Sequence, residues 1–167
     1  MAVVTTESNL ITNRDATPKV LNNSIIHNGT LKESVATVET ANGDDIASKF
    51  YFVTLPSNAR VSQILLYSDD IGTTTISDFG IYKSTADGGA VVDADFFASA
   101  VSLKDGALNG TDITHESGVF GVEDAEKPLW EALGLSADPK IMYDVVGTLT
   151  AAADAAGTIT LKVRYVL

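Results

Sequence analysis

The two histidines of the chain, His27 and His115, are the side chains best suited to acid–base catalysis near neutral pH. A Ser-His-Asp site needs a histidine held between a nucleophile and a carboxylate. Neither histidine lies in a nucleophile motif, and the chain contains no Gly-x-Ser-x-Gly sequence. His27 precedes Asn28-Gly29 and His115 precedes Glu116, contexts typical of loops or strand edges. The sequence therefore predicts no catalytic residue and no enzyme.

Several carboxylates occur in pairs that could bind a hard cation such as calcium. These pairs are Asp44-Asp45, Asp69-Asp70 and Asp93-x-Asp95. None matches the EF-hand loop with its central Gly and final Glu. His115-Glu116 has no helical spacing, and the chain has no cysteine or third histidine to complete a zinc site. Turn formation and helix capping explain the pairs better, so we expect no metal and no cofactor.

The size and charge of the chain exclude several classes of partner. Its 167 residues suit one domain, with or without an arm. Its net charge of −11 opposes binding to phosphate backbones, so we expect no nucleic-acid partner. No stretch approaches the ~20 apolar residues that cross a bilayer, and no signal peptide is visible, so we expect no membrane and synthesis in the host cytoplasm. The charge serves either solubility or docking to a basic surface.

Most of the chain consists of short β-like runs separated by turn signals. The clearest run is 158–166, in which every second residue from Ile159 to Tyr165 is apolar. Further strands are predicted at 34–40, 50–55, 60–68, 73–83 and 140–150. Residues 91–97 are predicted to form a short strand that runs into a turn of helix, and 104–112 a loop. Gly80 marks a bulge or a close approach of backbone.

One segment, 126–134, is predicted to form a short helix. Pro128 suits the first helical turn and Gly134 suits the C-terminal cap. The helical context of Trp130 indicates core packing. After this helix, the loop 151–157 is predicted to join the last two strands as a hairpin. Strands of this number and spacing predict an all-β fold, an antiparallel β-sandwich or jelly roll with one short helix.

The first 24 residues show no periodic pattern and are predicted to be irregular. Such a terminus is either frayed or an arm that becomes ordered on a partner. We therefore predict an extended N-terminal arm over 1–24 and a β-sandwich domain over 25–167.

Four blocks of the chain, 50–70, 78–103, 126–139 and 143–166, together resemble small virion structural proteins of tailed bacteriophages and prophages. The motifs that carry the resemblance are Leu-Pro-Ser-Asn-Ala-Arg, Gly-Ile-Tyr and Pro-Leu-Trp-Glu-Ala-Leu-Gly, in that order. Among such proteins, the chain is most similar to head decoration, or cement, proteins. The likeness covers about two-thirds of the chain and leaves out the first 45 residues.

The resemblance implies a β-sandwich or jelly roll that sits on the outer capsid surface of a virion and clamps subunits of the major capsid protein. Self-association as a dimer or trimer is expected, as in most closed assemblies. We predict that the arm contacts the capsid through four apolar anchors: Leu10, Ile11, Val20 and Leu21. Two alternatives stay open: a head–tail or tail component, and a carbohydrate-binding β-sandwich with an aromatic or Asp-lined groove.

Overall fold

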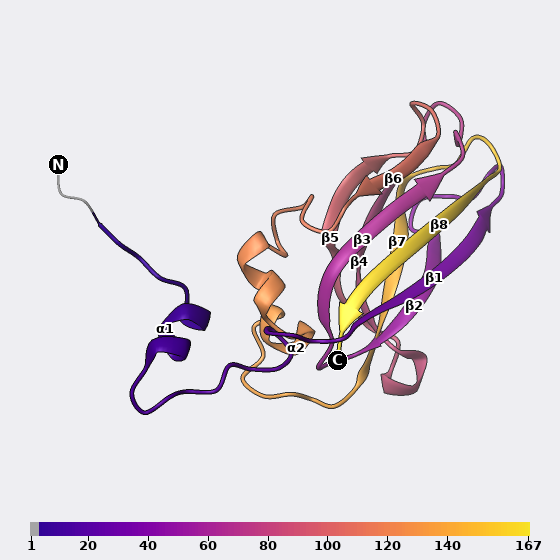
Figure 1. The fold of residues 1–167 in the computed structure, drawn as a ribbon. Helices are drawn as coiled ribbons and strands as arrows, with labels where there is room; N and C mark the ends of the chain where they lie inside the picture. The colour runs from indigo at the N-terminus through magenta and orange to yellow at the C-terminus, as the bar shows by residue number, and fades with distance from the viewer. Residues whose placement is uncertain (1–3) are drawn as a thin grey trace.

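A computed structural model of the chain describes residues 4–167 and shows two antiparallel four-stranded sheets packed face to face (Figure 1). One sheet has the strand order β1-β8-β3-β6 and the other β2-β7-β4-β5. The strands are β1 (Leu31–Thr40), β2 (Lys49–Pro56), β3 (Arg60–Ser68), β4 (Ile76–Lys83), β5 (Val91–Ser102), β6 (Leu108–Asp112), β7 (Met142–Ala151) and β8 (Gly157–Val166). The all-β sandwich predicted from the sequence is confirmed.

The strand order follows from one long hairpin that is rolled up. Its tip is the β4–β5 turn, where a 3-10 helix, η1 (Thr85–Asp87), ends at Gly88 with φ +100°. From this turn outwards, β4 pairs with β5, β3 with β6, β2 with β7 and β1 with β8. The successive pairs alternate between the two sheets, which is the arrangement of an eight-stranded jelly roll.

Alternation along each strand creates the core. In β8, Ile159, Leu161 and Val163 are buried while the residues between them are partly exposed, as the sequence predicted. Leu55 of β2 and Val145 of β7 bring buried side chains from the opposite sheet into the same cluster. Burial of apolar surface stabilises the fold by roughly 25 cal/mol per Å², so these inward rows hold the two sheets together.

Two predictions in the middle of the chain were wrong. Residues 91–97 do not run into a helix, because β5 continues as a strand to Ser102. Residues 104–112 are not all loop, because Leu108–Asp112 forms β6 at the edge of a sheet. The local pattern is weak in β5 because the strand is irregular: its register with β4 shifts three times, and neighbouring Phe96 and Phe97 are both buried.

The predicted hairpin at 151–157 was also wrong. β7 and β8 lie in different sheets, so this segment crosses from one sheet to the other. The N–H of Gly43 donates to the carbonyl of Ala153 at 2.8 Å, and the N–H of Ala153 donates to the carbonyl of Asp44 at 2.9 Å. The crossing is therefore fastened to the β1–β2 loop.

The predicted helix at 126–134 is present but shorter. A 3-10 helix, η2 (Val122–Glu126), comes first, and α2 (Leu129–Ala132) follows Pro128. Gly134 adopts φ +74° after the helix and its N–H donates to Glu131, so its capping role is confirmed. Leu129 is the buried residue of α2, whereas Trp130 is half-buried and was wrongly assigned to the core.

Gly80 lies where β5 passes over β4, which confirms the close approach predicted from the sequence. A Cβ atom on Gly80 would lie 2.2 Å from the carbonyl oxygen of Asp93 and 2.4 Å from the carbonyl carbon of Ala94. Both contacts are with backbone, which cannot move aside as a flexible side chain can. The irregular register of β5 thus requires a residue without a Cβ atom at position 80.

We predict that Gly80→Ala lowers the free energy of unfolding by roughly 1–3 kcal/mol, the usual effect of overpacking. Denaturant unfolding followed by tryptophan fluorescence measures the change. Gly121→Ala is the matched control, because its Cβ would meet only the mobile carboxylate of Glu123. Equal stability of the two variants would show that β5 adapts to a side chain at position 80.

Candidate functional site

The N-terminal arm is a hook that stands away from the sandwich (Figure 1). It contains a helix, α1 (Asn9–Asp15), which the sequence did not predict. The amide of Asn13 donates to the side-chain oxygen of Asn22 at 2.9 Å, and the amide of Asn22 donates to the carbonyl of Leu10 at 3.3 Å. The chain therefore folds back on its own helix.

The four predicted anchors lie on this hook in two different environments. Leu10 and Ile11, on α1, are half-buried. Val20 and Leu21 follow the helix and are 52% and 93% exposed. An exposed leucine on a projecting segment offers apolar surface to a partner, whereas a leucine in a hydrophobic core does not.

The base of the arm is tied to the sandwich by Arg60 at the start of β3. Its Nε donates to the carbonyl of Ile25 at 3.1 Å, and its Nη1 donates to the carbonyl of Ala125 at 2.7 Å. Arg60 thus joins the arm to the segment that carries η2. Sequence reasoning assigned this arginine no role, because its partners are backbone oxygens distant in sequence.

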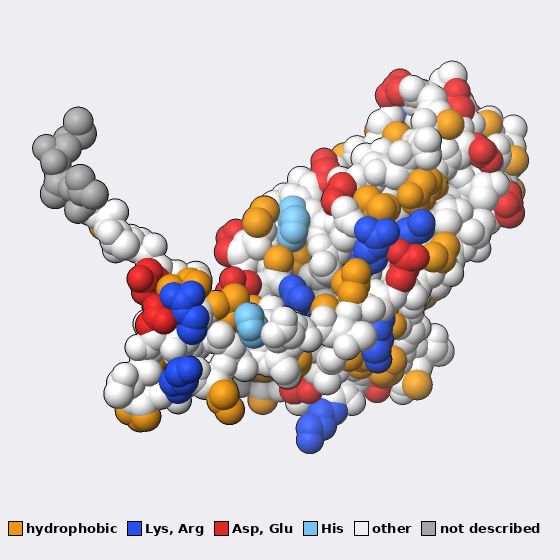
Figure 2. Space-filling view, viewed as in Figure 1, with side chains coloured by type: hydrophobic (Ala, Val, Ile, Leu, Met, Phe, Trp, Pro, Cys, Tyr) orange, Lys and Arg blue, Asp and Glu red, His pale blue; other side chains and the backbone are white. Residues whose placement is uncertain are grey.

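The opposite end of the sandwich is acidic. Paired strand ends bring four loops together there: 41–48, 69–75, 103–107 and 152–156. They contain one basic residue, Lys104, and six aspartates: Asp44, Asp45, Asp69, Asp70, Asp105 and Asp154. Figure 2 shows acidic side chains at this end, at the upper right of the view.

Some of these aspartates accept hydrogen bonds that hold the loops, within one loop or between two segments. Asp44 accepts a hydrogen bond from the N–H of Ala41 at 2.8 Å, and Asp69 accepts one from the N–H of Thr158 at 2.9 Å. Asp154 accepts from the hydroxyl and N–H of Thr73, which lower its pKa to about 2. Within residues 4–167, no group of three or more metal-binding side chains converges.

The Asp93-x-Asp95 pair lies on β5, apart from the acidic end. Partial burial raises the pKa of Asp93, and a hydrogen bond with Asp95 adds to the effect. Among the described residues, no third metal-binding side chain lies with this pair.

Neither histidine lies in a catalytic arrangement. His27 is exposed before β1. His115 stacks on Phe120 with ring centroids 5.1 Å apart, and its Nδ1 bonds to the Phe120 carbonyl at 2.8 Å. Ser57 donates to Asp138, but no histidine takes part in this pair among residues 4–167. The described part of the chain also has no helix long and apolar enough to cross a membrane.

Comparison with known proteins identifies the fold but no family. No family model and no curated protein matches the chain. A chain in the capsid of Ralstonia phage GP4 is similar in structure, with a TM-score of 0.54, 18% identity, and coverage of 83% of this chain and 84% of that one. Two further capsid chains match less well. One is from the cyanophage Pam1 capsid asymmetric unit, with a TM-score of 0.46, 19% identity, and coverage of 83% of this chain and 86% of that one. The other is from the acid-stable capsid of Helicobacter pylori bacteriophage KHP30, with a TM-score of 0.40, 18% identity, and coverage of 83% and 94%. The GP4 similarity shows a shared fold.

We predict that Asp154→Asn lowers the melting temperature at pH 7, because an amide bonds Thr73 less strongly than a carboxylate does. The wild-type pKa of Asp154 is lowered from 3.8 to about 2, so its contribution is complete above pH 4. That contribution declines as the pH falls from about 4 to about 2, and the two proteins should converge there. Melting curves between pH 2 and pH 7, roughly the range of Asp titration, test this. A difference that does not depend on pH would refute it.

Proposed function

We propose that this chain is a structural protein of a phage virion, that it binds the outer capsid surface as a decoration protein, and that it has no catalytic activity. The observation that carries the proposal is a jelly roll from which an N-terminal hook with exposed apolar residues projects. A chain of the GP4 capsid with the same fold supports it. The partner is then the major capsid protein.

The arm suits a clamp because it is extended and only lightly attached. Ile25, the residue that follows it, is bonded through its carbonyl to Arg60 of the sandwich, so the hook can adjust to a neighbour without unfolding the domain. On a capsid lattice many copies bind at once, and each contact can then be modest. Dimers or trimers at symmetry axes would add further contacts between copies.

The charge distribution supports one orientation on the capsid. Residues 4–24 carry two acidic and two basic side chains, namely Glu7, Asp15, Arg14 and Lys19. The far end carries six aspartates and one lysine. An orientation with the arm towards the capsid and the acidic loops towards solvent leaves this cluster of charges hydrated, which avoids the cost of burying it.

We predict that deletion of residues 2–21 leaves a folded sandwich that no longer binds capsids. The deletion removes α1 and all four anchors but keeps Ile25, the partner of Arg60. Binding is measured by sedimentation of the protein with undecorated particles. Far-UV circular dichroism with an unchanged melting temperature confirms the fold. Undiminished binding would exclude the arm as the clamp.

A point substitution tests the same contact in the full-length chain. Leu21→Asp places a charge on the most exposed anchor and should weaken capsid binding about tenfold or more, as loss of a buried apolar contact does. Ile46→Asp is the matched control, because Ile46 is 62% exposed in the acidic loops at the other end. Equal loss in both variants would contradict the proposed orientation.

The position of the protein in the particle separates decoration from the alternative structural role. A cryo-EM map of the virion should show the jelly roll outside the shell, at two-fold or three-fold positions. Density confined to the portal or tail would instead make the chain a head–tail or tail component.

A further inference from the structure

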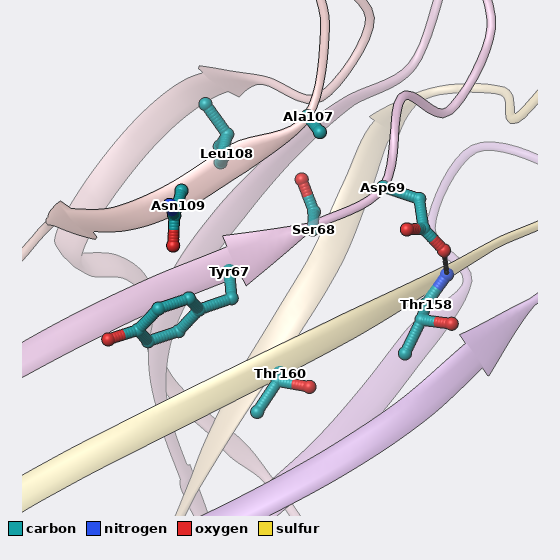
Figure 3. Close-up of a pocket in the computed structure, with 8 residues that line it drawn as sticks. All are labelled: Tyr67, Ser68, Asp69, Ala107, Leu108, Asn109, Thr158 and Thr160. Atoms are coloured by element: carbon teal, nitrogen blue, oxygen red, sulfur yellow. Dashed lines mark hydrogen bonds between the residues drawn. The ribbon is translucent and has the colours of Figure 1, made fainter.

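A shallow groove crosses the solvent face of the β1-β8-β3-β6 sheet near the acidic end (Figure 3). Its volume of about 390 Å³ is within the range of small-molecule sites, about 300–1,000 Å³. The polar side chains that line it come from three strands and one loop: Tyr67 and Ser68 of β3, Asp69 after β3, Asn109 of β6, and Thr158 and Thr160 of β8. Three separate parts of the chain thus converge on one hollow.

A β-bulge shapes the upper wall of this groove. Leu66 pairs with Thr111 and Tyr67 pairs with Asn109, so Gly110 is an extra residue in β6. Gly110 has φ +76°, the left-handed conformation of a glycine bulge. A Cβ on Gly110 would lie 3.2 Å from the Tyr67 hydroxyl oxygen, so the glycine leaves room for the ring. Bulges of this kind re-aim side chains beside binding sites.

The groove contains polar groups that the fold does not use. One carboxylate oxygen of Asp69 accepts from the N–H of Thr158 at 2.9 Å. The other oxygen of Asp69, the amide of Asn109 and the hydroxyl of Tyr67 have no hydrogen-bond partner within residues 4–167. The Nζ of Lys162 lies over the Tyr67 ring, 5.6 Å from its centroid, which is within the range of a cation–π contact. An aromatic ring thus lies beside an unused acceptor and an amide that both donates and accepts.

This set of groups matches a ligand whose hydroxyls donate and accept side by side. A carboxylate and an amide oxygen accept from hydroxyls, and the amide nitrogen donates to them. Lys162 brings one positive charge to the groove, but Asp69 and the aspartates of the neighbouring loops outnumber it, which disfavours phosphate and acidic sugars. A single half-used carboxylate is too little for a divalent cation. We propose that the groove binds a neutral hexopyranose unit of a saccharide, with Asp69 and Asn109 bonding its hydroxyls beside Tyr67.

The groove lies at the end of the sandwich away from the arm, so a copy attached through its arm keeps it accessible. The open shape implies weak binding to one copy, with a Kd in the millimolar range. An array of copies on one particle would strengthen attachment to a polysaccharide through avidity. Saccharide binding can be measured on the isolated protein, so its test is independent of the proposed capsid role.

The test is a titration of the full-length ¹⁵N-labelled protein, followed by amide chemical shifts. The probes are glucose, galactose, N-acetylglucosamine and dextran, each added to about 50 mM in hexose units, enough to load a millimolar site. We expect at least one probe to shift the amides of residues 67–69, 107–110 and 158–160. A response to free hexose indicates a monosaccharide site, whereas a response to dextran alone indicates a polysaccharide site, and both support the proposal.

Two pairs of variants locate the binding. Asn109→Ala should raise the Kd about tenfold, the effect of losing hydrogen bonds to a ligand. Asn58→Ala is its control, an exposed asparagine at the other end of the sandwich. Tyr67→Phe should weaken binding, while Tyr51→Phe, on the other sheet, should not. No shift with any probe, shifts outside the groove, equal binding by Asn109→Ala, or the same shifts with inorganic phosphate would overturn the proposal.

Discussion

The structure depends on burial of apolar side chains between two sheets, to which successive strands of the chain belong alternately. Every connection except β4–β5 crosses from one sheet to the other. Each strand except β5 therefore pairs with a strand that is distant in sequence, and the inward side chains of each sheet pack against the opposite sheet. The alternation of Ile159, Leu161 and Val163 in β8 is the direct mark of this constraint. Because these inward side chains are buried in the core, only the outward faces, the loops and the arm can contact other molecules.

The same constraint explains what the sequence could and could not predict. Period-two alternation is a local property, so the strand at 60–68 was located to the residue and the one at 158–166 to within one residue. Strand pairing is not local, so the segment 151–157 was taken for a hairpin when it is a crossing. β5 was cut short because its bulges over Gly80 interrupt the alternation. Trp130 was placed in the core because helical spacing alone does not show which face of a short helix meets the sheet.

Of the two candidate surfaces, the sequence predicted the arm but not the groove, because the groove depends on strand pairing. The arm was recognised from its lack of periodicity, and its apolar residues could be named, but the hook made by Asn13 and Asn22 is a tertiary feature. The groove was missed because Tyr67 and Asn109 become neighbours only when β6 pairs with β3. One local signal was present: Gly110 lies within a run of Gly, Asn and Asp that was assigned to loop, and a glycine inside an edge strand is typical of a bulge.

The jelly roll gives the two ends of the molecule different properties. The arm joins β1 at the end where the β2–β3, β4–β5 and β6–β7 connections lie, and the four other connections, with their aspartates, gather at the far end. Hydrogen bonds from Thr73 hold the Asp154 carboxylate between two of these loops and lower its pKa to about 2. Two copies that approach through their acidic ends repel each other over about 8–10 Å, the Debye length in physiological salt. This repulsion disfavours contacts between copies at the acidic end, near which the groove lies.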